Sequence, residues 1–340
     1  MTSLLGWYDR HRRDLPWRAG PGLVPDPYHV LVSELMLQQT TVATVSGRFD
    51  PFIARFPTLR FLAKANEADV LHAWQGLGYY RRARALHACA RAVVRDHGGV
   101  LPNGVDHLLA LPGIGAYTAK AVAAIAFDQP VIPVDGNVIR VLSRLFRLET
   151  PIPKVAKEVQ RQAEQFEPTP RPADTAQALM DLGAMVCRPR EPDCTRCPWL
   201  DACVAHAAGI AASLPKRAPK AERPLRQGVA FLMTRSDGAV FFRRRPSEGL
   251  LGGLHELPSS EWAAAPIDRE AALEQAPAKA DWCFHERKVR HVFTHFVLEL
   301  DLAEASPKDP PDGLWQPLGT FDELALPTVM KKLLRQAGHL

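Results

Sequence analysis

Long apolar runs are missing from this chain of 340 residues. Its apolar stretches, such as residues 121–127, are far shorter than the roughly 20 residues that span a bilayer, so no membrane role is expected. Nothing at the start resembles a signal peptide, and we therefore expect a cytoplasmic protein. Internal repeats and low-complexity tracts are also missing, so a repeat architecture is not indicated.

Neither sign of charge is in strong excess. The chain has 42 Lys and Arg against 37 Asp and Glu, which gives a formal net charge of +5. This excess mildly favours an anionic partner, but a solvated basic surface accounts for it equally well. Hydrophobic residues make up 46% of the chain, enough for a packed core in each of the two domains that the length suggests.

The composition changes near residue 214. Residues 1–213 show apolar positions three and four apart, broken by Pro and Gly, which predicts an all-α domain. Residues 214–226 are rich in Lys, Arg and Pro and are typical of a linker. Residues 227–340 form the second domain that we expect.

β-strand signals are confined to this second domain. Segments 229–234 and 239–243 are β-prone and flank Ser236-Asp237-Gly238, a turn signal, so they predict a hairpin. Residues 292–302 are a further strand candidate. The second domain is therefore expected to be α+β.

Four of the six cysteines stand close together, as Cys187-x6-Cys194-x2-Cys197-x5-Cys203. Thiolates this near one another indicate a metal centre. One CxxC pair flanked by single cysteines suits a cubane iron–sulfur cluster, whereas structural zinc sites more often show two close pairs; zinc is the alternative. A disulfide framework would need an oxidising compartment. We predict one 4Fe-4S cluster, with a structural role because protein supplies all four ligands.

The segment Leu111-Pro112-Gly113-Ile114-Gly115 predicts a tight turn that opens into a helix over residues 117–127. Backbone N–H groups at such a turn, with the helix dipole, can hold a DNA phosphate without reading any base, as helix–hairpin–helix elements do. Alone, the segment would be interpreted as an ordinary helix–turn–helix connection.

Two carboxylates stand in notable positions. Glu34 lies in an otherwise apolar helical stretch, and acidic residues are rarely buried without a reason. Asp135 is placed to cap the following helix. A desolvated carboxyl group has a raised pKa and can act as a general acid, while a second carboxylate can stabilise an oxocarbenium-like sugar. The pair therefore permits glycosidic chemistry.

Further motifs run along the chain: Leu15-Pro16-Trp17-Arg18, residues 33–40 (SELMLQQT), Gly76-Leu77-Gly78-Tyr79-Tyr80, residues 134–137 (VDGN), residues 180–184 (MDLGA) and Phe293-Thr294-His295. With the cysteines and the glycine turn, they resemble the MutY-type adenine DNA glycosylases of the helix–hairpin–helix superfamily over nearly the whole chain. The resemblance implies an all-α helix–hairpin–helix catalytic region with an iron–sulfur cluster loop at 187–203, followed by an α+β Nudix-like domain.

It also implies a function: excision of adenine mispaired with 8-oxoguanine or guanine in double-stranded DNA, by a monomer associated with the nucleoid. Glu34 would protonate the adenine, and Asp135 would stabilise the cationic sugar. The adenine must first be flipped out of the stack. Residues implied in binding the substrate are Trp17, Arg18, Leu37, Gln39, Tyr79, Tyr117, Asp181 and Thr294, and those at the DNA backbone are Gly113 and Gly115. The arginines within residues 81–95 fit a solvated helix face at least as well as phosphate contacts.

Two differences from related families restrict the reactions that we expect this chain to catalyse. Tyr117 stands where endonuclease III relatives carry a nucleophilic lysine, and since tyrosine cannot form a Schiff base, we predict a monofunctional glycosylase, although Lys120 lies nearby. In the second domain, residues 269–274 (REAALE) lack the glutamate pair of a working Nudix box, so we expect recognition of the damaged base rather than nucleotide hydrolysis. A catalytically idle lesion-binding protein and an endonuclease III-like lyase are the alternative functions.

Overall fold

The computed structural model describes residues 2–166, 171–218, 222–246 and 248–340. The chain divides into two compact units, residues 1–219 and 220–340. In the described part of the chain, no helix is long and apolar enough to cross a membrane.

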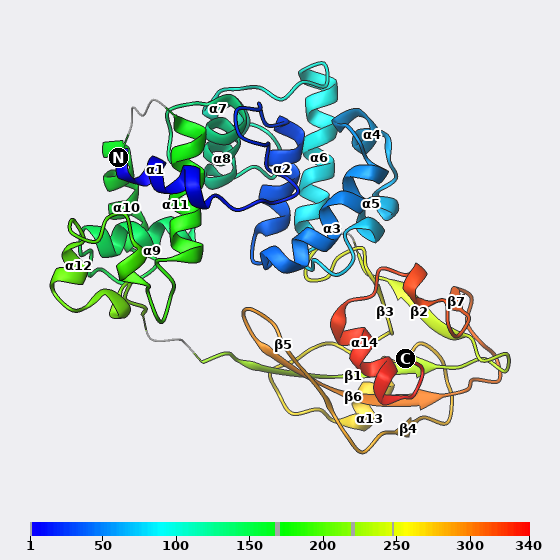
Figure 1. Cartoon of the computed structure of the whole chain (residues 1–340). Helices are drawn as coiled ribbons and strands as arrows, with labels where there is room; N and C mark the ends of the chain where they lie inside the picture. Colours follow the sequence, from blue (N-terminus) through cyan, green and yellow to red (C-terminus); the bar gives the residue numbers. More distant parts are fainter. Residues whose placement is uncertain (1, 167–170, 219–221, 247) are drawn as a thin grey trace. The chain divides into compact units, whose positions relative to one another are not determined.

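The first unit is helical throughout, as its periodicity predicts (Figure 1). Its α-helices are α1 (Thr2–His11), α2 (Pro27–Leu37), α3 (Val42–Arg55), α4 (Leu59–Lys64), α5 (Glu67–Ala73), α6 (Arg81–Asp96), α7 (Val105–Leu109), α8 (Ala116–Phe127), α9 (Gly136–Leu145), α10 (Val155–Ala163), α11 (Pro172–Met185) and α12 (Val204–Ala207). Single 3-10 turns cover Glu164–Phe166, Cys194–Arg196 and Ala211–Ser213.

Two buried helices, α2 and α8, form the centre of this unit. α2 is capped by Asp26, which accepts a hydrogen bond from the backbone N–H of Tyr28 at 2.7 Å, and begins with Pro27. α8 is rich in alanine, which lets neighbouring backbones come close. α2 packs between α8 and α6 (Figure 1), while α8 and α9 both pack against α11. The helices that carry Glu34 and Tyr117 therefore pack against each other, and α11 joins α8 to α9, which begins after Asp135.

The described residues of the second unit form two small sheets and two α-helices. The strands are β1 (Leu225–Met233), β2 (Val240–Arg244), β3 (His255–Glu256), β4 (Cys283–Phe284), β5 (Val289–Val292), β6 (Val297–Ala305) and β7 (Leu314–Gln316). The helices are α13 (Arg269–Leu273) and α14 (Thr328–Gln336), with a 3-10 turn at Phe321–Glu323. β1 and β6 pair in parallel, with β4 and β5 antiparallel to β6, and β2 lies between β3 and β7.

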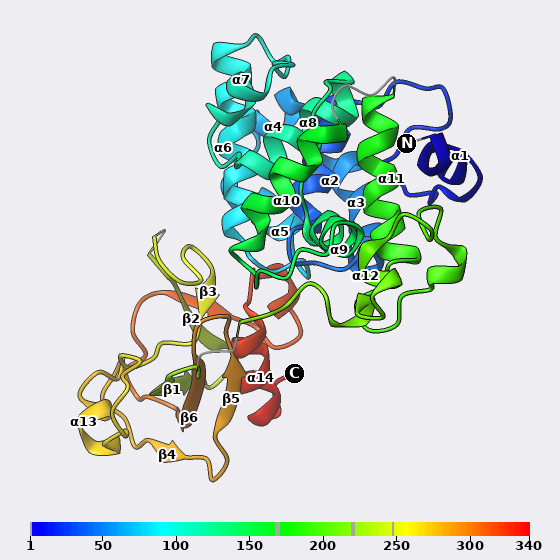
Figure 2. The ribbon, with the colours of Figure 1, turned by 90° about the vertical axis from the view of Figure 1, so that its left-hand side faces the viewer.

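The β1–β6 sheet is covered on both faces, as Figure 2 shows. Ala230 and Leu232 of β1 pack with α14, whereas Val229 and Phe231 pack on the side of α13. This alternation follows from the two-residue period of a strand. The expected α+β domain is confirmed.

Three local expectations differ from the structure. The predicted hairpin turn forms, with Thr234 bridged to Val240, but its strands join different sheets. Only Val292 of the strand expected at 292–302 belongs to β5, and β6 begins at Val297; between them lies a turn in which Phe293 N–H donates to Phe296 C=O at 2.9 Å. The β-prone sequence does not reveal this reversal.

The expected linker 214–226 is ordered at both ends. Leu214 is buried, and Ile152 N–H donates to Lys216 C=O at 2.9 Å, so residues 214–217 belong to the helical unit. β1 already includes Leu225 and Arg226, because a backbone ladder tolerates polar side chains at its exposed start. Residues 219–221 of this segment lie outside the described residues.

Candidate active site and cysteine cluster

Glu34 lies in the most deeply buried part of α2. Only 6% of its surface is exposed, and the hydroxyl of Tyr117, in the first turn of α8, donates a hydrogen bond to Glu34 Oε2 at 2.7 Å. Burial raises the pKa of Glu34 from 4.5 to about 7; the hydrogen bond from Tyr117 opposes this rise, and the charge of Asp135 adds to it. At neutral pH, a carboxyl group with this pKa holds a proton in a large fraction of molecules, as a general acid must.

Asp135 is the N-cap of α9. Its Oδ1 accepts a hydrogen bond from the backbone N–H of Val138 at 2.7 Å, and its Oδ2 accepts one from Asn137 Nδ2 at 2.8 Å. Burial raises the pKa of Asp135, while these hydrogen bonds act in the opposite direction because they stabilise the ionised form. The positive end of the α9 dipole also favours a negative charge here.

The two carboxyl groups lie within electrostatic reach of each other. The charge of Asp135 raises the pKa of both Glu34 and Tyr117, and Arg18 lowers that of Glu34. Neighbouring carboxyl groups do not ionise independently, and the hydrogen bonds decide which keeps its proton. We assign the proton to Glu34, which accepts a hydrogen bond from the Tyr117 hydroxyl, because Asp135 accepts hydrogen bonds from two N–H groups that stabilise its ionised form.

Arg18 and Asp181 form a buried ion pair beside this site. Arg18 donates two hydrogen bonds to the two oxygens of Asp181, at 2.7 and 2.8 Å, and Arg13 Nε donates a third at 2.7 Å. The Asp181 side chain is fully buried. Our expectation that Asp181 lines the adenine pocket is therefore corrected: both its oxygens bind arginine, so it orients Arg18. Trp17 is buried against Phe49, with ring centroids 5.7 Å apart.

The glycine turn joins α7 to α8, so the expected helix–hairpin–helix element is present. Gly113 has φ +74°, and a Cβ added there would lie 2.3 Å from Cβ of Ala85 in α6. Both facts require glycine. Gly115 caps α8, and both glycines are exposed. The first N–H groups of α8 have no partner within their own helix and are the donors that an anion would meet.

Gln39 and Tyr79 lie on two separate turns, one at the end of α2 and one before α6. Both side chains are exposed, and both residues have positive φ, 55° for Gln39 and 47° for Tyr79. Non-glycine residues in this region are uncommon and concentrate at functional sites. Leu37, the last residue of α2, is half-buried. Half of the surface of Tyr79 is exposed, so its ring is not packed in the core.

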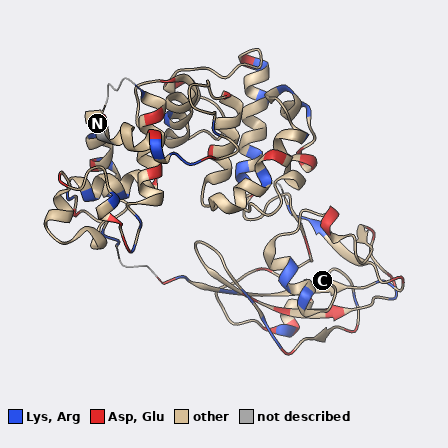
Figure 3. Cartoon of the chain, in the orientation of Figure 1, with Lys and Arg blue, Asp and Glu red and all other residues tan. Residues whose placement is uncertain are grey.

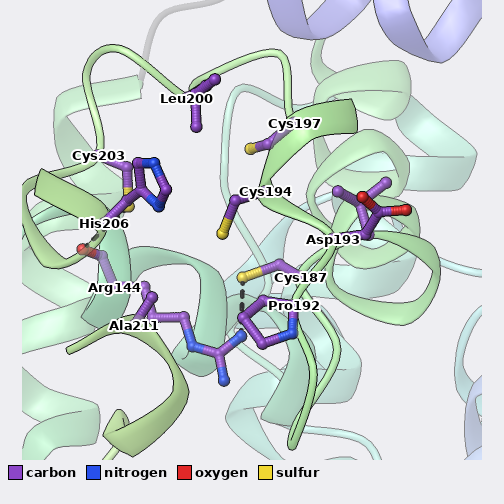
Figure 4. Close-up of a pocket in the computed structure, with 11 residues that line it drawn as sticks. Arg144, Cys187, Pro192, Asp193, Cys194, Cys197, Leu200, Cys203, His206 and Ala211 are labelled. Atoms are coloured by element: carbon purple, nitrogen blue, oxygen red, sulfur yellow. Dashed lines mark hydrogen bonds between the residues drawn. The ribbon is translucent and has the colours of Figure 1, made fainter. Parts of the chain in front are cut away.

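The four predicted metal ligands converge on one pocket (Figure 4). All six cysteines of the chain are free thiols, so the disulfide alternative is contradicted by the structure. Arg144 of α9 donates a hydrogen bond to Cys187 Sγ at 3.3 Å and further ones to the backbone carbonyls of Arg188 and Pro189. A guanidinium beside a thiolate balances its negative charge. Within the described residues, no three His, Cys, Asp or Glu side chains are grouped closely enough to bind one metal ion.

Phe293-Thr294-His295 occupies the turn between β5 and β6 in the second unit. Thr294 and His295 are exposed, whereas Phe293 stacks on Trp262 and lies edge-on to His291, with centroids 6.1 and 4.6 Å away. The aromatic packing holds the base of the turn and presents its polar tip. Along the ribbon of both units, Lys and Arg alternate with Asp and Glu (Figure 3).

Two family models match the chain. The HhH-GPD superfamily of base excision DNA repair proteins matches residues 32–168, and the NUDIX domain matches residues 229–336. The chain is 36% identical to human adenine DNA glycosylase over 98% of this chain and 73% of that protein. It is 40% identical to adenine DNA glycosylase of Mycobacterium tuberculosis over 82% of this chain and 88% of that protein. The chain belongs to the adenine DNA glycosylase family.

Solved structures support the same fold for the helical unit. The structure of a thermostable thymine-DNA glycosylase matches with a TM-score of 0.54 and 30% identity, over 61% of this chain and 94% of that chain. An endonuclease III trapped as a covalent DNA intermediate matches with a TM-score of 0.51 and 22% identity, over 62% and 96% of the two chains, which shows the fold alone. The resemblance inferred from the motifs is thus confirmed.

Several residues that organise the site were missed from the sequence. Asn137 bridges Asp135 and Arg140, accepting a hydrogen bond from Arg140 Nη2 at 2.7 Å, and Arg140 Nε donates to the Cys187 carbonyl at 2.6 Å. α9 therefore contacts both the carboxylate site and the cysteine loop. The only available signal was the spacing of Arg140 and Arg144, four apart on one helix face. For Arg82, the only sequence feature that could have indicated a role in the site is its place after the Gly-Leu-Gly-Tyr-Tyr motif.

Proposed function

We propose that this protein hydrolyses the N-glycosidic bond of adenine mispaired with 8-oxoguanine or guanine in duplex DNA. As a member of the adenine DNA glycosylase family it is a hydrolase of base excision repair. One observation carries the assignment of roles: Glu34, with a pKa raised to about 7, lies within electrostatic reach of Asp135, which is supplied with N–H donors.

In the proposed reaction Glu34 donates its proton to a ring nitrogen of adenine. The bond between the sugar C1′ and the base then breaks, its electrons leave with the neutral adenine, and the sugar becomes oxocarbenium-like. Asp135 stabilises this cation through its negative charge. Addition of water to C1′, with loss of a proton, gives the abasic product.

The reaction stops at the abasic site, because the chain lacks a nucleophile at the position of the lyase lysine. Tyr117 stands there, and its hydroxyl donates a hydrogen bond to Glu34. Tyrosine forms no Schiff base. Lys120, three residues further along α8, is half-buried and belongs to a different register. Borohydride trapping of the enzyme on DNA through Lys120, with prompt strand cleavage, would contradict this assignment.

DNA binding follows from the exposed turns. Gly113 and Gly115 present backbone N–H groups to a phosphate, while Gln39 and Tyr79 enter the duplex and fill the space that the flipped adenine leaves. Trp17, Arg18, Leu37 and Tyr117 surround the flipped base. Arg18 acts through its guanidinium, which Asp181 holds in place.

One 4Fe-4S cluster bound by Cys187, Cys194, Cys197 and Cys203 is the cofactor that we propose. The donor set fits: the four cysteines border one pocket, and one CxxC pair flanked by single cysteines suits a cubane whose four corners take one thiolate each. The cluster would link the loop 187–203 to α9 and supply structural stability rather than chemistry.

Recognition of 8-oxoguanine is assigned to the second unit. Thr294, at the exposed tip of the β5–β6 turn, is the candidate for a hydrogen bond to the oxidised edge of the base. The Nudix-like unit is not proposed to hydrolyse nucleotides, since its α13 has no glutamate pair and Arg269 is paired with Asp301. We propose a monomer in the cytoplasm, at the nucleoid, where thiols stay reduced.

The test is single-turnover excision of adenine from a duplex with one A:8-oxoguanine pair. The wild type should release adenine without cutting the strand, and Asp135→Asn should bind the duplex but release little. A protein that binds the lesion yet releases no adenine would be an idle lesion-binding protein. Release coupled to strand cleavage would support a lyase.

A further inference from the structure

Arg82 is a buried cation without a carboxylate partner in the described part of the chain. It lies in the first turn of α6, and 8% of its surface is exposed. Burial lowers its pKa to about 10, so it stays charged at neutral pH. A buried charge is costly unless hydrogen bonds satisfy it. Such a residue is poorly suited to a phosphate contact, since its guanidinium points into the protein.

The guanidinium binds two turns that are distant in sequence. Nη1 donates to the carbonyls of Leu35 and Met36, both at 2.8 Å, and to that of Gln38. Nη2 donates to the Thr40 hydroxyl at 3.0 Å and to the carbonyls of Leu77 and Gly78 at 2.9 and 3.2 Å. One nitrogen thus binds mainly the end of α2, and the other mainly the turn before α6.

Each turn presents one exposed side chain with positive φ: Gln39 on the first and Tyr79 on the second. The acceptors Gln38 and Thr40 flank Gln39, and Gly78 precedes Tyr79. The Arg82 guanidinium also lies 5.4 Å from the Tyr79 ring centroid. The turns are also joined by the hydrogen bond from the Thr40 hydroxyl to the Leu77 carbonyl at 3.3 Å.

We propose that Arg82 is a positioning residue: it holds the two turns at a fixed separation, so that Gln39 and Tyr79 enter the DNA duplex together. The inference rests on the proposed function, in which this pair enters the duplex as adenine is extruded. A planar guanidinium with donors on two separate nitrogens can hold two turns at a fixed separation, whereas the single ammonium of lysine cannot. Both turns are then already in place when the adenine is extruded from the duplex.

The main experiment compares Arg82→Lys with Arg95→Lys, a control at the exposed end of the same helix. Both variants keep the charge. Arg82→Lys should lower the single-turnover rate on an A:8-oxoguanine duplex by about 10- to 100-fold, the scale of a displaced positioning group. Arg95→Lys should change it less than about 2-fold. The salt dependence of DNA binding should be the same in both, because no phosphate contact is removed. An Arg82→Lys rate like that of the wild type overturns the proposal, as does a salt dependence reduced by one contact.

A double-mutant cycle separates positioning from a general loss of structure. In a Gln39→Ala/Tyr79→Ala background, Arg82→Lys should cost less than about 2-fold, because the groups that it positions are gone. The same fold-loss in both backgrounds would overturn the proposal. If Arg82→Lys does not fold, as judged by thermal unfolding, Thr40→Val replaces it: it removes one acceptor, and its smaller loss should also vanish in the double-alanine background.

The proposed function fails separately. A wild type that releases no adenine refutes the glycosylase assignment. A Gln39→Ala/Tyr79→Ala variant that is as fast as the wild type refutes the proposal that this pair enters the duplex and, with it, the proposed role of Arg82. A third outcome refutes only the role of Arg82: the Gln39→Ala/Tyr79→Ala variant is slower than the wild type, and adding Arg82→Lys lowers its rate by the same factor as in the wild type.

Discussion

Replacing Glu34 with glutamine removes one proton-binding site from the centre of the helical unit and little else. The amide keeps the shape of the side chain, and its oxygen can still accept the hydrogen bond that Tyr117 donates at 2.7 Å to Glu34 Oε2. The substitution also removes the negative charge of ionised Glu34, which the nearby charge of Asp135 disfavours. Effects of Glu34→Gln on stability and on activity therefore have separate physical causes and can be predicted separately.

The effect on stability depends on pH. Because burial raises the pKa of Glu34 from 4.5 to about 7, the folded state holds this proton more tightly than the unfolded chain does. The free energy of unfolding therefore falls as the pH rises from about 4.5 through about 7, by a total of about 3 kcal/mol. Glutamine has no such penalty. Glu34→Gln should be more stable than the wild type at pH 9 by up to about 3 kcal/mol, and nearly equal to it at pH 5.

Activity should change in the opposite direction. An amide donates no proton of suitable acidity, so excision by Glu34→Gln should fall by about 100-fold or more at pH 7. In the wild type, excision should decline as the pH rises through about 7, since the reactive form is the protonated acid. The assays are thermal unfolding between pH 5 and pH 9 and single-turnover excision of adenine across pH 6–9.

The control is Glu164→Gln, which removes a carboxylate from an exposed 3-10 turn of the same unit. It should leave the rate of adenine excision close to that of the wild type. A Glu34→Gln variant that is no more stable than the wild type at pH 9 would show that Glu34 is ionised without penalty in the folded protein. A variant that still excises adenine at a rate close to that of the wild type would refute its role as the acid.

Further predictions concern other parts of the site. Tyr117→Phe removes a hydrogen bond that lowers the pKa of Glu34, so the decline of excision should move to higher pH, which a pH–rate profile would detect. Gly113→Ala, whose Cβ would overlap α6 at a positive φ, should cost about 1–3 kcal/mol of stability in thermal unfolding and weaken DNA binding. Cys197→Ser should lower the iron content and visible absorption of the purified protein; iron equal to the wild type would count against a role as ligand. A fragment ending at residue 218 should still excise adenine opposite guanine but lose most preference for 8-oxoguanine, whereas Thr294→Ala should cost only about 1 kcal/mol of that preference; an unchanged ratio of the two rates in the fragment would place recognition in the helical unit.

The sequence predicts those features that depend on local pattern. The helical periodicity, the cap at Asp135 and the glycine turn are each set by neighbouring residues, and each is present. The convergence of the four cysteines follows from their spacing. The mostly apolar stretch around Glu34 left open whether its side chain is buried or partly exposed, and the structure shows that it is buried.

Features that depend on distant partners could not be predicted. Asp181 is an ion-pair partner rather than a pocket residue because Arg13 and Arg18, more than 160 positions away in sequence, reach both its oxygens. Arg82 is indistinguishable in sequence from the exposed arginines of α6, since only the fold decides that carbonyls surround it. Likewise, the turn at Phe293 is set by pairing between β5 and β6 rather than by a turn motif.

The parallel register of β1 with β6 affects how the chain reaches its native state during synthesis. Leu225 pairs with Val297, and every pair in this ladder joins residues about 70 positions apart, a separation typical of slow-forming contacts. Helices of the first unit can pack as soon as they leave the ribosome, whereas β1 must wait, with its apolar residues unpaired, for several seconds at about 5–20 residues per second. During that interval the unpaired β1 is exposed to aggregation, and we expect Arg223 just before it and Arg226 at its start to act as its gatekeepers.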